Sequence, residues 1–230
     1  MRQLAPYAVI YLLAIACAAG VATASQAAEP LQVQIGYLGY RPDPGPLLSN
    51  VIPEPADAGQ RGAELAIIDS NSTGAFLNQR YSLTTATVDT PDALLAAAQA
   101  QHAQGLRLFV VNAPAASLRQ LSAALPDSLL FNAGSPDDSL RSTDCLGNVL
   151  HTLPSRAMLA DALAQFLVVR KWQKALLIVG PTEDDQAYAA ALRRAAKRFG
   201  VQWVAEKAWR FDNDQRRSAQ ADMPLFTQTA

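Results

Sequence analysis

The chain has 230 residues, half of them apolar, and a formal net charge of −1. This length is sufficient for one or two domains with sizeable cores. The balanced charge gives no reason to expect nucleic acid or an anionic membrane surface as a partner.

The N-terminal residues have the features of a secretory signal peptide. A short positive region precedes Ala8–Val21, an apolar segment that is too short to cross a bilayer comfortably. Small residues follow it and predict cleavage after Ala27, or alternatively after Ala24. A lipoprotein with Cys17 as the lipidated residue is the other alternative. We expect residues 1–27 to be a signal peptide and the remainder to be exported.

Cysteine and histidine are too sparse to build a metal centre. Removal of the signal peptide leaves Cys145 as the sole cysteine, so no internal disulfide is expected, and its apolar neighbour predicts a buried thiol. His102 and His151 have no cysteine or acidic partner at the spacing of metal ligands, so we expect structural roles and no metal or other cofactor. Asp212–Asp214 lacks the later glycine and acid of a calcium loop, which predicts a solvated turn.

Alternating strands and helices predict a parallel α/β lobe over residues 28–140. The expected strands are 31–38, 81–88, 106–111 and 129–131, and the expected helices are 56–71, a segment from Thr90–Pro91 to Gly105, and 116–124. Such alternation through short loops gives right-handed crossovers and a parallel sheet. The prolines of residues 40–55 predict an irregular loop after the first strand, where site loops are common. In the following helix, the predicted inner side carries Ala58, Gly62, Leu65 and Ala66, with Asp69 as a further candidate.

A second α/β lobe is predicted over residues 141–230. Residues 134–147 are polar and aperiodic, which indicates the crossing between lobes. The expected elements are a strand at 149–152, a helix starting at Pro154–Ser155, a buried strand at 174–179, a helix closed by Gly200, and a strand at 201–209. The apolar spacing of Leu159, Ala162, Leu163 and Phe166 predicts the buried side of the first of these helices. The pattern weakens after Phe211, so we expect an incomplete second lobe, either a fragment of a longer protein or a truncated gene model.

The strongest functional signal is the set of polar loops at the carboxyl ends of the predicted strands. The sequence has no nucleophile elbow, P-loop, H-E-x-x-H or G-x-G-x-x-G motif, so no catalytic residue is assigned. Ligands of open parallel sheets bind beyond the carboxyl ends of the strands. The candidate ligand-binding residues there are Tyr40, Arg41, Asn112, Ser117, Asn132, Ser135, Glu183, Asp184, Asp185 and Gln186. The alternative for the three acids is a favourable interaction with the helix dipole alone.

Several sequence phrases carry a family resemblance. Gly62–Ala63, Ala66 and Asn71 match the G-A-x-x-A-x-x-x-x-N helix of type I periplasmic solute-binding proteins, the leucine/isoleucine/valine-type receptors of ABC transporters. A narrower group is also similar, the ABC substrate-binding proteins associated with pyrroloquinoline quinone-dependent alcohol dehydrogenase systems. The phrases that resemble this group are LLFNAGSPDDSLR, CLGNVLHTLPSRAMLADALAQFL, YAAALRRAAKRFG and MPLFTQT.

The resemblance implies a two-lobed periplasmic protein that closes over a small-molecule solute and presents it to a permease in the inner membrane. It implies neither enzymatic activity nor a cofactor. Family members that bind amino acids use hydroxyl groups from the first lobe and an aromatic side chain from the second lobe. Glu183–Asp185 replaces that aromatic here and would repel a carboxylate, so a polar neutral or cationic solute is expected. The alternative is a sensor or accessory protein of the quinoprotein dehydrogenase system without a transport role.

Overall fold

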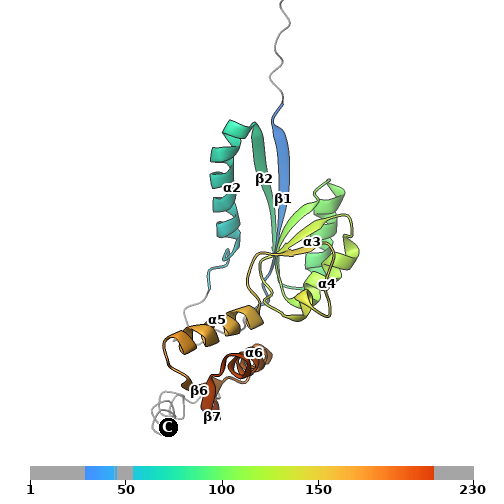
Figure 1. Cartoon of the computed structure of the whole chain (residues 1–230). Helices are drawn as coiled ribbons and strands as arrows, with labels where there is room; N and C mark the ends of the chain where they lie inside the picture. The colour runs from blue at the N-terminus through green and yellow to red at the C-terminus, as the bar shows by residue number, and fades with distance from the viewer. Residues whose placement is uncertain (1–28, 44, 46–53, 210–230) are drawn as a thin grey trace, which may run out of the picture.

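The computed structural model describes residues 29–43, 45 and 54–209 (Figure 1). Its strands are β1 (Leu31–Tyr40), β2 (Gln79–Val88), β3 (Leu108–Asn112), β4 (Leu129–Asn132), β5 (Val149–His151), β6 (Lys174–Val179) and β7 (Gln202–Ala208). Its helices are α2 (Gln60–Gly74), α3 (Pro91–Ala103), α4 (Ala115–Ala124), α5 (Arg156–Val169) and α6 (Glu183–Phe199), with short 3-10 turns at Ala75–Leu77 and Ser139–Arg141. The predicted signal peptide, most of the proline-rich loop and Asp212–Asp214 lie outside the described residues. Within these residues, no helix is long and apolar enough to cross a membrane.

The first sheet has five parallel strands in the order β2-β1-β3-β4-β5. Its main core lies on the side of α3 and α4, where Leu38, Leu94, Phe109, Leu118 and Leu130 are fully buried. Helix α2 lies along β1 and β2 (Figure 1). Central parallel strands are buried on both faces, which explains the nearly continuous apolar run of β3. The predicted parallel α/β architecture is confirmed.

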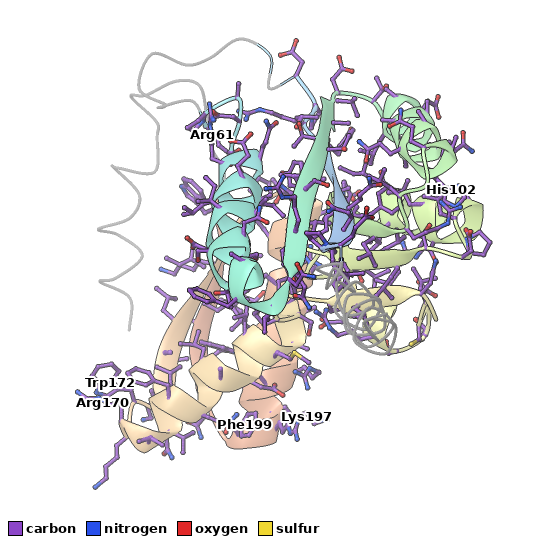
Figure 2. All side chains as sticks on the ribbon, turned by 90° about the horizontal axis from the view of Figure 1, so that it is seen from above. Arg61, His102, Arg170, Trp172, Lys197 and Phe199 are labelled. Atoms are coloured by element: carbon purple, nitrogen blue, oxygen red, sulfur yellow. The ribbon has the colours of Figure 1, made fainter. Side chains whose placement is uncertain are left out.

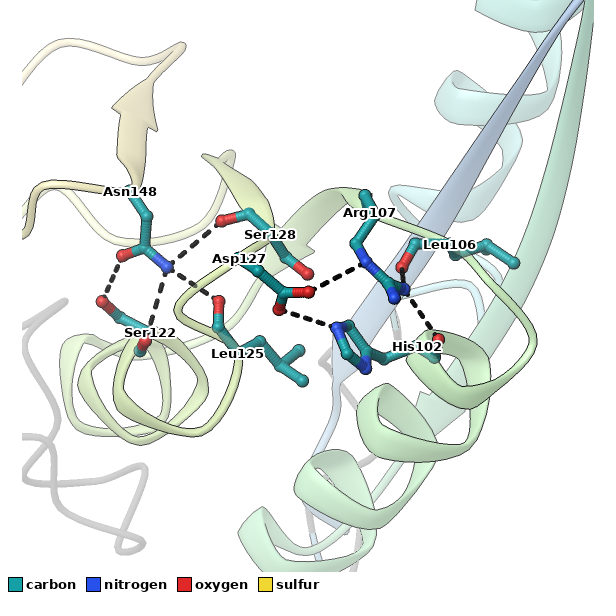
Figure 3. A network of polar contacts seen from close by, with 8 residues as sticks. All are labelled: His102, Leu106, Arg107, Ser122, Leu125, Asp127, Ser128 and Asn148. Atoms are coloured by element: carbon teal, nitrogen blue, oxygen red, sulfur yellow. Dashed lines mark hydrogen bonds and ion pairs between the residues drawn. The ribbon is translucent and has the colours of Figure 1, made fainter.

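Strand β5 belongs to the first sheet, and its predicted place at the opening of the second lobe is wrong. Leu130 pairs with Val149, and Asn132 pairs with His151. The reason is a polar anchor immediately before the strand (Figure 3). The Asn148 amide donates to the main-chain oxygens of Ser122, Leu125 and Ser128 at 3.3, 3.0 and 3.2 Å. It therefore fastens the returning chain beside β4, and we propose that the lobe boundary, predicted at residue 140, lies after β5.

The side chains before β5 also differ from the sequence prediction. Cys145 is exposed, whereas a buried thiol was predicted. Its neighbour Leu146 is the residue that packs against the first core. The short segment between the 3-10 turn and β5 turns only one of these two side chains inward, and the larger apolar one occupies that position.

A second polar group lies nearby in the same view (Figure 3). His102 Nε2 lies 2.8 Å from Asp127 Oδ1, and Arg107 Nε lies 3.0 Å from Asp127 Oδ2. The hydrogen bond with His102 lowers the pKa of Asp127. This contact ties the end of α3 and the start of β3 to the turn before β4, in line with a structural role for His102.

The remaining strands form a separate two-stranded parallel sheet, in which α6 connects β6 to β7. Helix α5 packs on α6 through small side chains: Ala160 and Ala164 meet Ala191, Ala195 and Ala196. Small residues allow the two helix axes to approach closely. The fold thus uses an alanine face of α5 as its contact with α6.

The predicted buried face of α5 is wrong, and that of α2 is wrong at Leu65, although Ala66 does line the cavity between α2 and the sheet. Leu159, Leu163 and Phe166 of α5 are 40%, 42% and 53% exposed, and Ala162 is also exposed. Leu65 of α2 is 59% exposed. Both helices carry apolar residues on more than one side, so their periodicity fits more than one packed face.

The inner side of α2 is set by hydrogen bonds as well as by apolar contact. The Asn71 side chain accepts from Tyr81 N at 2.8 Å and donates to Tyr81 O at 2.9 Å. Its amide thereby pairs with β2 in the manner of a neighbouring peptide group. This contact turns Ala63 and Ile67 toward the sheet and leaves Leu65 outside.

We predict that Asn148→Ala lowers the free energy of unfolding by about 1–3 kcal/mol, because it leaves main-chain oxygens at the α4–β4 turn without their donor. Urea denaturation of the chain lacking residues 1–27 provides the measurement. Thr143→Ala, an exposed change in the same segment, is the control and should stay within about 0.5 kcal/mol of the parent. Equal midpoints for the two variants would contradict the anchoring role of Asn148.

Candidate functional site

The carboxyl ends of β1, β3, β4 and β5 lie along one edge of the first sheet, because all of these strands are parallel. The predicted site residues at this edge are Tyr40, Arg41, Asn112, Asn132 and Ser135. The corresponding end of β6 leads through Gly180 into the acidic first turn of α6. Polar loops therefore lie at the carboxyl ends of strands in both parallel sheets, as the sequence predicts.

Asn132 is fully buried and organises this edge from within. Its Oδ1 accepts from the main-chain N–H groups of Gly134 and Ser135 at 3.2 and 2.9 Å. Its Nδ2 donates to Ser135 O at 2.8 Å and lies 2.9 Å from His151 Nδ1. Every polar atom of this side chain is occupied, so Asn132 shapes the loop that follows β4 and presents no free group to a ligand.

His151 is the partner that sequence reasoning missed at this edge. Burial is the main cause that lowers its pKa, and the nearby Arg141 cation acts in the same direction. The contact with Asn132 Nδ2 requires His151 Nδ1 to act as an acceptor, so the neutral ring is the form that fits. The sequence signal was only its position at the end of an expected strand.

Two of the predicted hydroxyl ligands are turned inward. Ser117 and Ser135 are each 4% exposed. Ser117 lies on the inner side of α4, and Ser135 Oγ accepts from Asp137 N at 3.4 Å within its own loop. These two hydroxyl groups are therefore part of the folded interior and do not face a ligand.

Asn112 lines a cavity of about 340 Å³ between α2 and the sheet. Its Nδ2 donates to Tyr37 Oη at 3.3 Å. Ile35, Ile67 and Val110 are among the apolar residues that line the same cavity. The predicted site residue Asn112 is thus a polar group in the lining of a mainly apolar cavity.

Gly59, which precedes α2, also lines this cavity. Gly59 has φ 83°, and a Cβ placed on it would lie 2.5 Å from Tyr37 Oη. A side chain there would be strained and would also displace the tyrosine. Sequence reasoning missed both Gly59 and Tyr37, since neither stands in a recognisable motif.

Tyr40 and Arg41 close β1 and start the proline-rich loop. Tyr40 is half-buried and packs against the first core. The Arg41 guanidinium donates to Glu54 O at 2.5 Å and to Pro55 O. It therefore holds the two ends of the loop together, which is a scaffolding role for a residue predicted to face the ligand.

The polar side chains in the first turn of α6 make different contacts. Asp185 forms a capping box with Thr182, and the hydroxyl of Thr182 is the main cause that lowers the pKa of Asp185. Asp184 is paired with Arg156. Gln186 Nε2 donates to Gly180 O at 2.8 Å. Glu183 is exposed at the start of α6, beyond the carboxyl end of β6.

Arg156 connects this turn to the first lobe. Its side chain is 12% exposed and pairs with Asp184, and its main-chain N–H donates to Pro136 O at 2.9 Å. Burial alone would raise the pKa of Asp137, but hydrogen bonds from Ser139 and the cations Arg156 and Arg119 outweigh it and lower the pKa. Arg156 thus interacts favourably with an acid after β4, Asp137, and with an acid of the α6 turn, Asp184.

The start of α5 is also capped from the first lobe. Asp138 Oδ1 accepts from Ala157 N at 3.0 Å, beside the cap that Ser155 provides for Met158 N. An acid at a helix N-terminus is favoured by the dipole. The loop after β4 therefore fixes the direction in which α5 leaves the first lobe.

Among the described residues, no group of three or more histidine, cysteine or acidic side chains could hold a metal ion.

Comparison with known proteins identifies the fold. No family model and no curated protein sequence matches the chain. A branched-chain amino acid ABC transporter periplasmic ligand-binding protein from Burkholderia xenovorans matches with a TM-score of 0.65 and 19% identity, over 85% of this chain and 51% of that one. The chain has the type I periplasmic binding protein fold.

Two further structures agree. A leucine-, isoleucine-, valine-, threonine- and alanine-binding protein from Brucella ovis matches with a TM-score of 0.59 and 16% identity, over 82% of this chain and 49% of that one. An ABC transporter substrate-binding protein from Desulfitobacterium hafniense, in complex with leucine, matches with a TM-score of 0.59 and 17% identity, over 86% and 56%. The chain spans about half the length of these structures.

We predict that acidification destabilises this edge through His151. Because the folded state lowers its pKa, the unfolded chain takes up the proton first as pH falls below the ordinary value of 6.5. Stability should therefore decline from pH 6.5 down to the folded pKa, below which this contribution is constant. His151→Gln should remove that part of the decline in denaturation curves recorded from pH 7.5 to 5. A stability difference between parent and variant that does not change with pH would refute this assignment.

Proposed function

We propose that the chain is the substrate-binding component of a periplasmic ABC-type transport system and binds a small polar solute between its two lobes. The observation that carries the proposal is the type I periplasmic binding protein fold, together with polar loops at the carboxyl ends of both sheets. In this proposal the lobes close by a hinge motion and present the solute to an inner-membrane permease. The protein acts by binding and has no catalytic role.

We infer a neutral or cationic solute from the charges that remain at the site. Asp184 is compensated by Arg156, and Asp185 is engaged with Thr182, so Glu183 is the acid left to meet a ligand. On the first lobe, the half-buried Asn112 side chain lies at the carboxyl end of β3 and shares a hydrogen bond with Tyr37 Oη. These groups suit a solute with hydroxyl or amine substituents.

A narrower proposal is that the solute takes part in alcohol oxidation. The resemblance of LLFNAGSPDDSLR and neighbouring phrases to proteins of quinoprotein alcohol dehydrogenase systems supports a solute from that chemistry. The second candidate is a periplasmic sensor or accessory protein of the same system, which would use the fold without a permease. An adjacent permease and ATPase gene would support transport, and an adjacent sensor kinase gene would support the second candidate.

Thermal-shift screening against alcohols, aldehydes, acids and amines tests ligand binding. A ligand present at 100 times its Kd should add about 2.7 kcal/mol of stability. The screen is run on the chain lacking residues 1–27, and in parallel on any longer gene product that contains it. A stabilising neutral or cationic compound is the expected result, and the absence of any shift would favour the accessory role.

We predict that Glu183→Gln weakens the binding of a cationic ligand about five- to tenfold, the effect of losing one partly solvated charge interaction of about 1 kcal/mol. Isothermal titration with a ligand from the screen provides the measurement. Glu64→Gln, on the outer helix α2, is the matched control and should bind like the parent. If both variants bind equally well, Glu183 has no role in recognition.

A further inference from the structure

We call α5, β6, α6 and β7 together the second unit. It exposes several large apolar side chains where α5 ends and β6 begins (Figure 2). Val169 is 79% exposed, Trp172 is 54% exposed and Phe166 is 53% exposed. This end lies at the amino terminus of β6, opposite the candidate site at its carboxyl terminus. We define the distal patch as Phe166, Val169, Arg170, Lys171, Trp172 and Lys174.

The turn that ends α5 holds these side chains in place. Lys171 has a positive φ of 61°, and Trp172 N donates to Leu167 O at 2.8 Å. Such a turn commonly brings the residue after the left-handed position against the last helical turn. Here the ring of Trp172 meets Phe166 edge-on, with centroids 6.2 Å apart. Trp172 is therefore exposed but positioned.

The residue at the left-handed position is unusual. Helix α6 ends in the same conformation with Gly200, at φ 80°. Glycine adopts this conformation without strain, whereas a lysine does not. The chain thus accepts backbone strain at Lys171, where it gains a cation beside Trp172.

Charge is segregated along the second unit. Arg194 and Arg198 pair with Asp161, and Arg193 pairs with Glu206. The sequence contains no acid from residue 162 to residue 182, and Arg170 lies over the Trp172 ring at 5.1 Å. The distal patch is consequently cationic, although the net charge of the whole chain is −1.

We propose that the distal patch docks the protein on an anionic lipid bilayer. Aromatic and aliphatic side chains insert at the boundary between headgroups and acyl chains, and cations beside them pair with lipid phosphates. Charge complementarity selects this partner. In α2, by contrast, the exposed Leu65 and Ile68 lie beside Glu64 and Asp69, and the cation Arg61 is paired with Asp57 and Glu64. The surface is independent of the proposed solute site and lies at the other end of β6.

Vesicle flotation tests the proposal on the chain lacking residues 1–27, because the apolar signal segment would itself bind lipid. Vesicles of phosphatidylcholine are compared with vesicles containing 30% phosphatidylglycerol, a composition chosen as roughly that of a moderately anionic membrane. We expect binding to the anionic vesicles alone, loss of binding in high salt, and a blue shift of tryptophan fluorescence. Trp172→Ser should abolish the blue shift.

Lys171→Gly separates binding from folding. Glycine relieves the left-handed strain, so the variant should melt at the same or a higher temperature, while loss of one cation should weaken vesicle binding roughly fivefold. Leu65→Ser is the matched control and should bind vesicles like the parent. The proposal is overturned if the parent does not bind anionic vesicles, or if Lys171→Gly and Trp172→Ser bind like the parent. It is equally overturned if light scattering shows that Trp172→Ser converts a dimer into a monomer without changing vesicle binding.

Discussion

The side chain of Asn132 is the interaction on which the candidate site depends. Its amide joins the loop that follows β4 to the end of β5, through contacts with Gly134, Ser135 and His151. Thr152 adds two further bonds to the Asn132 main-chain oxygen. A buried amide must satisfy its donors and acceptors, so the loop has little freedom to adopt another path. These contacts fix the path of the loop after β4 relative to the end of β5.

The same constraint extends toward the second unit. The loop shaped by Asn132 continues into Pro136 and Asp138, which accept hydrogen bonds from the first main-chain N–H groups of α5. Arg156 then links this junction to the acidic turn of α6 through Asp184. The loop after β4 and the acidic turn of α6 are therefore connected through a short chain of hydrogen bonds and one ion pair. A hinge motion of the proposed kind would have to act on these contacts.

The sequence predicted the strands, the helices and the parallel α/β class, because strand propensity, caps and terminal glycines act locally. It did not identify the packed sides of α2 and α5. Both helices have apolar residues on two sides, and only the hydrogen bonds of Asn71 and the alanine contacts of Ala160 and Ala164 select one. Strand β5 was misplaced for a related reason, since the anchor at Asn148 joins residues more than twenty positions apart.

The predicted site was partly correct in position and often wrong in role. Asn132, Ser135, Asp185 and Gln186 lie at the carboxyl ends of strands, as predicted, yet their polar atoms are used to build the loops. Sequence shows where polar residues gather but does not show which of them satisfy main-chain groups. Tyr37, Gly59 and His151 were missed because their importance arises only from contacts made in the folded chain.

Hydrogen–deuterium exchange of an Asn132→Ala variant tests the central claim most directly. If this amide holds the edge together, the main-chain amides of Gly134, Ser135 and Thr152 should exchange faster than in the parent. The amides of α3, on the opposite side of the core, should retain their protection. Unchanged exchange at the three edge amides in a folded variant would contradict the account.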